Sequence, residues 1–365
     1  MIDTVGIIMT GDSDERLAEL TRVRSVSALP VAGRYRLIDF TLSGMVNSGI
    51  NNVGVTTRNN YRSLMDHLGS GKEWDLNRKL YGLRILPPYI RGSEGYSGDI
   101  DILNGIGDFL ERSKQQYVLI AHGDLLFNPR FDQIRAQHIE SGADITVMYT
   151  EGEVNPPNVR IELDGIRVTD MEVSSQYSTQ GNTLQGIYFM SKELLCQQIA
   201  HCAGRGLHDF TMDVLVRNVD KMKICGYKYD GFVGRIDSVN SYYVNNMRML
   251  DSDVRKELFL NKNFIYTKVK DTVPTYYSSD ARVTKSVIAD GCRIEGTVEN
   301  SIIFRGVTVA KGACIRNSIV MQNSTIEKDV RLDYAVLDKS VTVRQGKSIA
   351  GQESFPVIIG KDLTV

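Results

Sequence analysis

The sequence predicts an α/β chain in which a doubly wound, mixed and mostly parallel sheet is followed by a parallel β-helix of hexapeptide coils. Over the first 250 residues, short β-rich runs alternate with helical patterns, which is typical of parallel strands joined by crossover helices. After about residue 275, aliphatic residues return every six positions, as stacked three-sided coils require. We therefore expect domains over residues 1–250 and 276–365, with a linker over 251–275.

The first domain contains strand and helix candidates in alternation. Because the ligands of an open doubly wound sheet bind at the carboxyl ends of its strands, we expect any site there. Gly142 is well placed to end the second helix. The predicted strands are Val5–Met9, Asn52–Thr57, Tyr117–Ala121 and Asp144–Tyr149, and the predicted helices are Asp101–Ser113 and Asp132–Ser141.

The second domain repeats itself. The segment Asn300–Phe304 recurs 17 residues later as Asn317–Met321, and again as Tyr334–Asp338. The alternative is an antiparallel sandwich, but sandwich strands alternate at period two rather than six. Because such coils usually stack on other copies, we expect an oligomer. The residues that return at period six are Ile288, Ile294, Ile303, Val309, Ile315, Val320, Ile326, Leu332, Leu337 and Val343.

The composition limits the partners and the cellular compartment that we expect for the protein. The formal net charge is −1 and no block of Lys or Arg occurs, so nothing points to nucleic acid or an anionic membrane as partner. The five cysteines are scattered without metal-ligand spacing, which favours a reducing compartment. The N-terminus has no signal-peptide core, and no apolar run reaches transmembrane length. We expect a cytoplasmic protein.

Three motifs carry a resemblance to a known family. The run Gly33–Ser43, followed by Val46–Ile50, is similar to the G-K-Y-R-I-I-D-F-P-L-S-N…N-S-G-I signature of ADP-glucose pyrophosphorylases (glucose-1-phosphate adenylyltransferases). Tyr61–His67 and Asp209–Leu215 resemble later elements of that family. The resemblance implies a Rossmann-like nucleotidyltransferase domain followed by a left-handed β-helix, and it covers nearly the whole chain.

The family's reaction transfers the adenylyl group of ATP to glucose 1-phosphate, which releases pyrophosphate. In that family a glycine-rich loop holds the triphosphate, and Mg²⁺ lies between carboxylates and phosphate oxygens. Here the loop motif L-A-G-G-x-G-T-R-L keeps only Gly11, Arg16 and Leu17. Asp12 and Asp14 replace loop residues, and a carboxylate ~5 Å from a phosphate charge costs about 3 kcal/mol before screening. Alternatively, these acids point to solvent and the loop still binds.

The metal and sugar-phosphate elements are altered as well. By the resemblance, Asp124 is the first metal-binding aspartate, whereas its partner has become Arg235; Asp237 could serve only after a two-residue slip. Ser174 stands where the family's sugar-phosphate lysine is expected, and the segment Arg24–Leu29 lacks a second lysine. A metal would therefore have Asp124 at most, and no metal is the favoured expectation.

The remaining matched positions predict a nucleotide-like pocket without assured chemistry. Asp124 and Arg16 are read as vestiges of the catalytic machinery. Asp39, Asn47 and Gly49 are assigned structural roles at caps, turns and a left-handed position. The pocket residues are Gly11, Arg16, Arg36, Gly98, Asp101, Asp124 and Gly186.

Scaffold motifs are kept while four catalytic elements are replaced, and this favours the regulatory, GlgD-type branch of the family. The resemblance then implies a hetero-oligomer, expected to be a tetramer, with a catalytic GlgC-type subunit that requires Mg²⁺. This chain itself would bind no cofactor tightly, and the cleft could accept a small phosphorylated effector. One alternative is an active pyrophosphorylase with relocated ligands at Asp124 and Asp237. The other is a hexapeptide acyltransferase, which would need a histidine near the coils, yet none follows His208.

Overall fold

A mixed sheet of nine strands forms the centre of the N-terminal domain in the computed structural model, which describes residues 1–11, 15–58, 60–87, 98–154, 158–173, 179–261 and 263–365. Parallel strands β5, β4, β1 and β6 make one half, and β11 runs antiparallel to both β6 and β8. All four strands predicted from the sequence are confirmed. Across the sheet the order is β5 (Gly82–Leu86), β4 (Asn52–Thr56), β1 (Thr4–Met9), β6 (Tyr117–His122), β11 (Thr179–Ser191), β8 (Ile145–Val154), β12 (Ile224–Lys228), β10 (Arg167–Val173) and β9 (Val159–Asp164).

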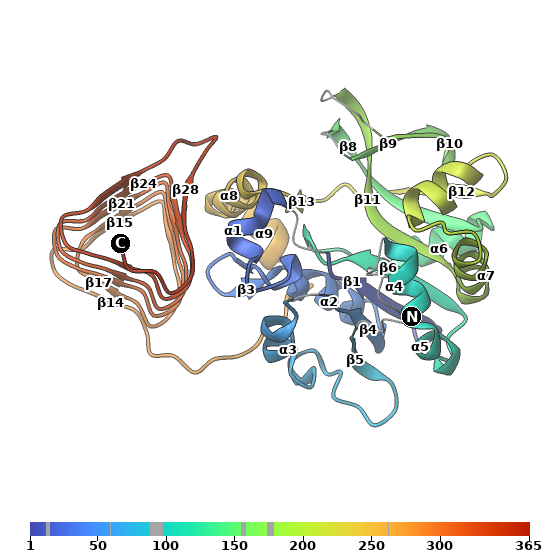
Figure 1. The fold of residues 1–365 in the computed structure, drawn as a ribbon, viewed down its shortest axis with the longest axis horizontal. Coiled ribbons are helices and arrows are strands. Elements are labelled where there is room, and N and C mark those ends of the chain that lie inside the picture. Colours follow the sequence, from blue (N-terminus) through green and yellow to red (C-terminus); the bar gives the residue numbers. More distant parts are fainter. Residues whose placement is uncertain (12–14, 59, 88–97, 155–157, 174–178, 262) are drawn as a thin grey trace.

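Helices pack around this sheet (Figure 1). The helix predicted to end at Gly142 is confirmed, and Gly142 adopts the left-handed conformation with φ of 59°. The prediction of one helix over 101–113 is wrong, because Gly105 and Gly107 flank a break at Ile106 and glycine weakens a helix interior. The helices are α1 (Ala18–Thr21), α2 (Leu37–Asn47), α3 (Arg62–Leu68), α4 (Asp99–Gly105), α5 (Gly107–Arg112), α6 (Phe131–Ser141), α7 (Lys192–Ala203), α8 (Val239–Met247) and α9 (Ser252–Phe259).

The C-terminal domain is a parallel β-helix whose three faces are five-stranded parallel sheets in the described part of the chain. Ile302 pairs with Ile319, which confirms the 17-residue offset of the repeat, and the period-six aliphatics from Ile294 onward are buried. The first sheet comprises β14 (Tyr276–Tyr277), β17 (Arg293–Ile294), β20 (Thr308–Val309), β23 (Thr325–Ile326) and β26 (Thr342–Val343). The second comprises β15 (Arg282–Thr284), β18 (Thr297–Glu299), β21 (Cys314–Arg316), β24 (Arg331–Asp333) and β27 (Ser348–Ala350). The third comprises β16 (Val287–Ile288), β19 (Ile302–Ile303), β22 (Ile319–Val320), β25 (Ala335–Leu337) and β28 (Val357–Ile359).

The third sheet of the β-helix packs against the N-terminal domain. Its strands carry two apolar residues in succession, because one side chain points into the coil and the next points out. Ile303 belongs to the interior of the β-helix, whereas Ile302, Ile319 and Val336 join the same buried cluster as the N-terminal domain. In Figure 1 this face lies beside α8 and α1. The two domains therefore share one hydrophobic core.

A buried ion pair crosses this domain interface. The Arg24 guanidinium lies 2.9 Å from the carboxylate of Asp338, and the two side chains are 2% and 1% exposed. Nearby, the Tyr243 hydroxyl donates to the carbonyl of Asn317 at 2.6 Å. Because both contacts are made by groups away from water, they fix the register in which the β-helix docks.

The stretch over 251–275 begins with α9, whose Leu258 is buried in the N-terminal domain, and continues as extended chain to β14. Asn47 donates to the Phe264 carbonyl at 2.9 Å, and the Ser43 hydroxyl accepts from the Tyr266 amide at 2.9 Å. These bonds hold the extended segment along α2. Within the described residues, no helix combines the length and apolarity needed to cross a membrane.

Breaking the interface ion pair should destabilise the protein. Asp338→Ala leaves the buried Arg24 guanidinium without its carboxylate, which we expect to cost about 3–5 kcal/mol in the free energy of unfolding. Urea denaturation followed by circular dichroism measures this loss. The matched control is Asp253→Ala, which removes an exposed partner of Lys256 and should lower the free energy of unfolding far less, because exposed ion pairs contribute little. Equal effects of the two substitutions would contradict the prediction.

Candidate functional site

The carboxyl ends of β1 and β6 form one edge of the candidate site. Met9 pairs with His122 in parallel register, and the Gly123 amide donates to the Met9 carbonyl at 2.9 Å. The loops that follow these strands therefore leave the sheet side by side, as expected for a doubly wound sheet. Asp124 lies in the second of these loops, and Gly11 in the first.

Asp124 is paired with Arg235. The guanidinium Nη1 donates to Asp124 Oδ2 at 3.0 Å, and the two side chains are 18% and 20% exposed. Their backbones are held together as well, because β7 (Leu125–Leu126) pairs antiparallel with β13 (Gly234–Arg235). The Ile236 amide donates to the Asp124 carbonyl at 3.0 Å. The register thus sets Ile236 opposite Asp124, and of its two neighbours it is Arg235 whose side chain bonds to the Asp124 carboxylate.

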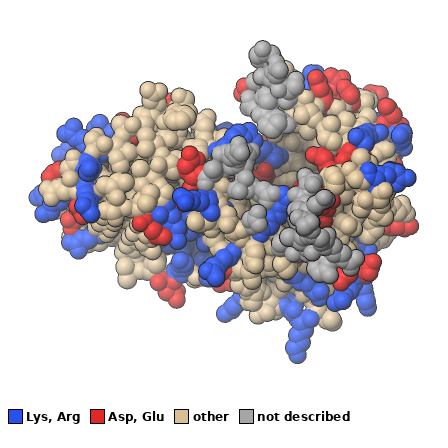
Figure 2. Space-filling model, in the orientation of Figure 1, with Lys and Arg blue, Asp and Glu red and all other residues tan. Residues whose placement is uncertain are grey.

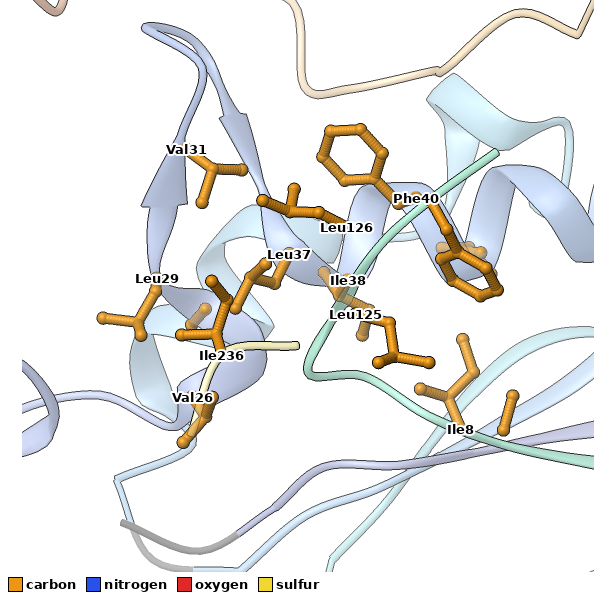
Figure 3. Packing of buried hydrophobic residues seen from close by; sticks show 14 of the residues in the cluster. Ile8, Val26, Leu29, Val31, Leu37, Ile38, Phe40, Leu125, Leu126 and Ile236 are labelled. Atoms are coloured by element: carbon orange, nitrogen blue, oxygen red, sulfur yellow. The ribbon is translucent and has the colours of Figure 1, made fainter. Parts of the chain in front are cut away.

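Core packing anchors both strands of this pair. Leu125, Leu126 and Ile236 are buried to within 1% of full burial. Figure 3 shows these side chains beside Leu37 and Ile38, which begin α2. The two site residues are thus carried by neighbours that cannot shift without disturbing the core.

The chemistry of this pair does not fit a magnesium site. Mg²⁺ takes oxygen ligands in near-octahedral geometry, whereas a guanidinium offers only N–H donors and carries positive charge. Asp124 Oδ1 is buried and has no hydrogen-bond partner among the described residues, so a single carboxylate remains as an acceptor. The pair of Asp124 and Arg235 therefore lacks the set of oxygen ligands that a divalent cation takes.

Gly98 and Asp101 are brought together at the start of α4. The Gly98 amide donates to Asp101 Oδ2 at 3.3 Å, and His208 Nδ1 lies 2.9 and 3.0 Å from the two Asp101 oxygens. A side chain at position 98 would collide with the His208 carbonyl, which explains the glycine. His208 was not predicted as a residue of this site, although it directly precedes the Asp209–Leu215 motif.

Gly186 is a point of close packing. Its φ is 68°, and a Cβ there would lie 3.0 Å from Cδ2 of His122, which precedes Asp124 by two residues. Next to it on β11, Tyr188 is buried, and burial raises its pKa despite a bond between its hydroxyl and that of Thr211. Gly186 therefore shapes the wall of the site rather than contacting a ligand through a side chain.

The other predicted pocket residues do not all lie near Asp124. Gly11 follows β1, and no atom of the described residues lies within 4 Å of the place where its Cβ would be; Arg16 is exposed in a short 3₁₀ turn (Glu15–Leu17). Asp12, Asp14 and Ser174 lie outside the described residues. Arg36 has different neighbours: its guanidinium Nη1 donates to the carbonyl and hydroxyl of Ser63 at 2.8 and 2.7 Å.

Arg36 belongs to a second candidate site, which we call the interdomain basic cluster. It comprises Arg24, Arg36, Lys270, Arg305 and Lys339, drawn from the N-terminal domain, the extended segment and the β-helix. Each of Arg36, Lys270 and Lys339 feels the charge of at least one other member. Figure 2 shows Lys and Arg side chains gathered where the two domains meet.

The five cations of this cluster lie near four carboxylates, those of Asp39, Asp66, Asp290 and Asp338. Burial, reinforced by Arg36 and Arg24, lowers the pKa of Lys339 to about 7, and burial lowers the pKa of Arg36 to about 10. Burial together with neighbouring cations also lowers the pKa of Lys270 and of Arg305. Arg305 is 6% exposed, and its Nε and Nη2 have no hydrogen-bond partner among the described residues. Groups of this kind favour an anion with several acceptor oxygens.

Comparison with known proteins agrees with both parts of the fold. Residues 5–240 match the nucleotidyl transferase family, and residues 271–354 match the GlmU-like C-terminal hexapeptide family. The chain is 30% identical to the glucose-1-phosphate adenylyltransferase of Bacillus cereus (strain Q1), over 97% of the chain and 96% of that protein. The chain belongs to the ADP-glucose pyrophosphorylase family.

Two further relatives are named glycogen biosynthesis protein GlgD. The protein from Bacillus subtilis (strain 168) is 36% identical over 98% of the chain and 96% of its own length. The protein from Geobacillus stearothermophilus is 40% identical over 85% of the chain and 82% of its own length. The resemblance read from the motifs is therefore confirmed, and it extends to the GlgD branch.

The lowered pKa of Lys339 predicts a specific pH dependence of stability. Between pH 7 and 10 the unfolded chain binds a proton at this lysine that the folded chain does not, so stability should rise with pH over this window. Relative to Lys339→Met, the wild type should gain up to about 1 kcal/mol per pH unit. Thermal or urea unfolding of both proteins across pH 6–10 measures the difference, and a constant difference would contradict the prediction.

Proposed function

We propose that this chain is a regulatory, catalytically deficient subunit of glucose-1-phosphate adenylyltransferase in bacterial glycogen synthesis. The observation that carries the proposal is the Asp124–Arg235 ion pair at the position where the family's reaction needs a divalent cation. The glycogen biosynthesis proteins named GlgD among its relatives support the same assignment.

The loss of activity follows from the reaction's demands on charge. Attack of the sugar phosphate on the α-phosphorus of ATP gathers negative charge on the transferring phosphoryl group and on the departing pyrophosphate. Positioning and charge neutralisation supply most of the catalysis, and the metal is a large part of that neutralisation. A single guanidinium that already bonds to Asp124 supplies less charge and cannot bridge phosphate oxygens as a metal does.

The partner in this proposal is a catalytic GlgC-type subunit, joined with this chain in a cytoplasmic hetero-oligomer, most simply a tetramer. The Mg²⁺ would serve the catalytic partner, and this chain would bind no cofactor tightly. No nucleic acid or membrane partner is proposed. A subunit without turnover can still change its neighbour if it favours one of two states of the assembly.

The two alternatives have less support. An active enzyme with Asp124 and Asp237 as metal ligands would need the Asp237 side chain beside Asp124, whereas the Arg235 guanidinium lies there. A hexapeptide acyltransferase would need a histidine near the coils, and no histidine follows His208 in the sequence.

We also propose that this subunit binds a small phosphorylated effector, and the interdomain basic cluster supports this. Its cations come from both domains, so an anion bound among them would neutralise charge on both sides of the interface at once. Because binding would favour the docked arrangement over any looser one, the effector would act on how the domains fit together. The sequence predicted a different place for this effector, namely the cleft beside Asp124.

Turnover separates the proposed role from the first alternative. With Mg²⁺, ATP and glucose 1-phosphate, the isolated chain should form ADP-glucose at least about 100-fold more slowly than a catalytic homologue, given the missing charge. Co-expressed with that homologue, it should change the rate or the effector response. A normal rate from the isolated chain, or a partner with unchanged kinetics, would refute the role.

Anion binding at the cluster can be measured without turnover. Inorganic phosphate should raise the melting temperature of the wild-type chain, because an anion that binds only the folded state stabilises it. Lys339→Gln should weaken this stabilisation several-fold. The exposed Lys256 lies on α9, and Lys256→Gln should leave it unchanged. An identical phosphate response in Lys339→Gln would argue against an anion site there.

A further inference from the structure

The position of Arg235 is fixed by the fold and does not depend on the ion pair alone. Its carbonyl accepts a hydrogen bond from Asn245 Nδ2 at 3.0 Å, which ties β13 to α8. The preceding Gly234 has no room for a side chain, because a Cβ would lie 2.5 Å from Asn245 Oδ1. With the β7–β13 pairing on its other side, the backbone of residue 235 is held opposite Leu125, the residue after Asp124, whatever side chain it carries.

The charge balance at this position is equally specific. Asp124 is largely buried, and a carboxylate in such surroundings needs a positive partner to remain ionised without a large cost. Either a metal or a basic side chain can be that partner. Arg235 provides it within the chain, at 3.0 Å, and uses only one of its five N–H donors in the bond to Asp124.

We infer that Arg235 takes the place of a divalent cation, so that the cleft keeps a fixed positive charge next to Asp124 and excludes metal ions. The guanidinium repels an approaching cation and occupies one of the two carboxylate oxygens of Asp124. The backbone around it still has the arrangement that would place two carboxylates together. A single change, Arg235→Asp, should therefore create a divalent cation site from Asp124 and the new carboxylate.

This inference deepens the proposed loss of catalysis and rests on it, but its test measures metal binding rather than turnover or assembly. The full-length chain is titrated with Mn²⁺, and free Mn²⁺ is followed by electron paramagnetic resonance. Any Mn²⁺ binding by the wild type should be the same in Asp124→Asn, because Asp124 binds no ion in the wild type. Arg235→Asp should gain one site, tighter than any wild-type binding by about 100-fold or more, because one charge is removed and its opposite added.

Two further variants make the result unambiguous. Asp124→Asn in the Arg235→Asp background should abolish the new site, since one carboxylate cannot hold the ion alone. Arg235→Asn removes the guanidinium without adding a carboxylate, and it should bind Mn²⁺ more weakly than Arg235→Asp but measurably better than the wild type. This variant also decides the matter if Arg235→Asp does not fold.

Three results would overturn the inference. They are Asp124-dependent Mn²⁺ binding by the wild type, a folded Arg235→Asp protein that binds no Mn²⁺, or equal binding by Arg235→Asn and the wild type. Circular dichroism and the melting temperature establish folding in each case. None of these results would by itself decide the regulatory role, which is judged by turnover and by the response of the catalytic partner.

Discussion

The apolar contact between the third β-helix sheet and the N-terminal domain is the constraint on which the rest of the structure depends. Apolar packing alone tolerates small slips, whereas a buried ion pair such as Arg24–Asp338 is satisfied in one register only. That register also positions Lys339, the residue after Asp338, among the cations of the N-terminal domain. The interdomain basic cluster is therefore a product of domain docking and exists in neither domain alone.

Helix α8 connects this interface to the old catalytic cleft. Tyr242 donates to the Pro30 carbonyl, and Tyr243 donates to the carbonyl of Asn317 in the β-helix. One turn further along, Asn245 bonds to the carbonyl of Arg235 beside Asp124. A single helix thus contacts both the domain interface and the cleft. Anion binding at the interface could therefore be coupled to the cleft through α8, provided that this helix can adopt two positions.

The repeats and the strand pattern predicted the architecture because each depends on local periodicity. The period-six aliphatics predicted the coils of the β-helix. The paired isoleucines at 302–303 also indicate a strand that is buried on both faces, but the docking of this face on the N-terminal domain was not predicted from them. Asp124 and Arg235 could be matched by motif, although their mutual contact required the structure. The sequence could not place Arg36 with Lys339, because more than 300 residues separate them and only docking brings them together. The role of His208 could not be predicted either, since it comes from Asp101, which lies 107 residues away along the chain.

The presence of an arginine at position 235 has a physical explanation in the burial of Asp124. Simple loss of the second carboxylate would leave Asp124 largely buried with no positive partner, at a cost of several kcal/mol if it stayed ionised. Most replacements at position 235 would therefore destabilise a segment that Leu125 and Ile236 fix in the core. An arginine neutralises the carboxylate and keeps β7 and β13 together without a metal. The substitution thus preserves the scaffold without a metal, which is the combination expected of the regulatory subunit proposed above.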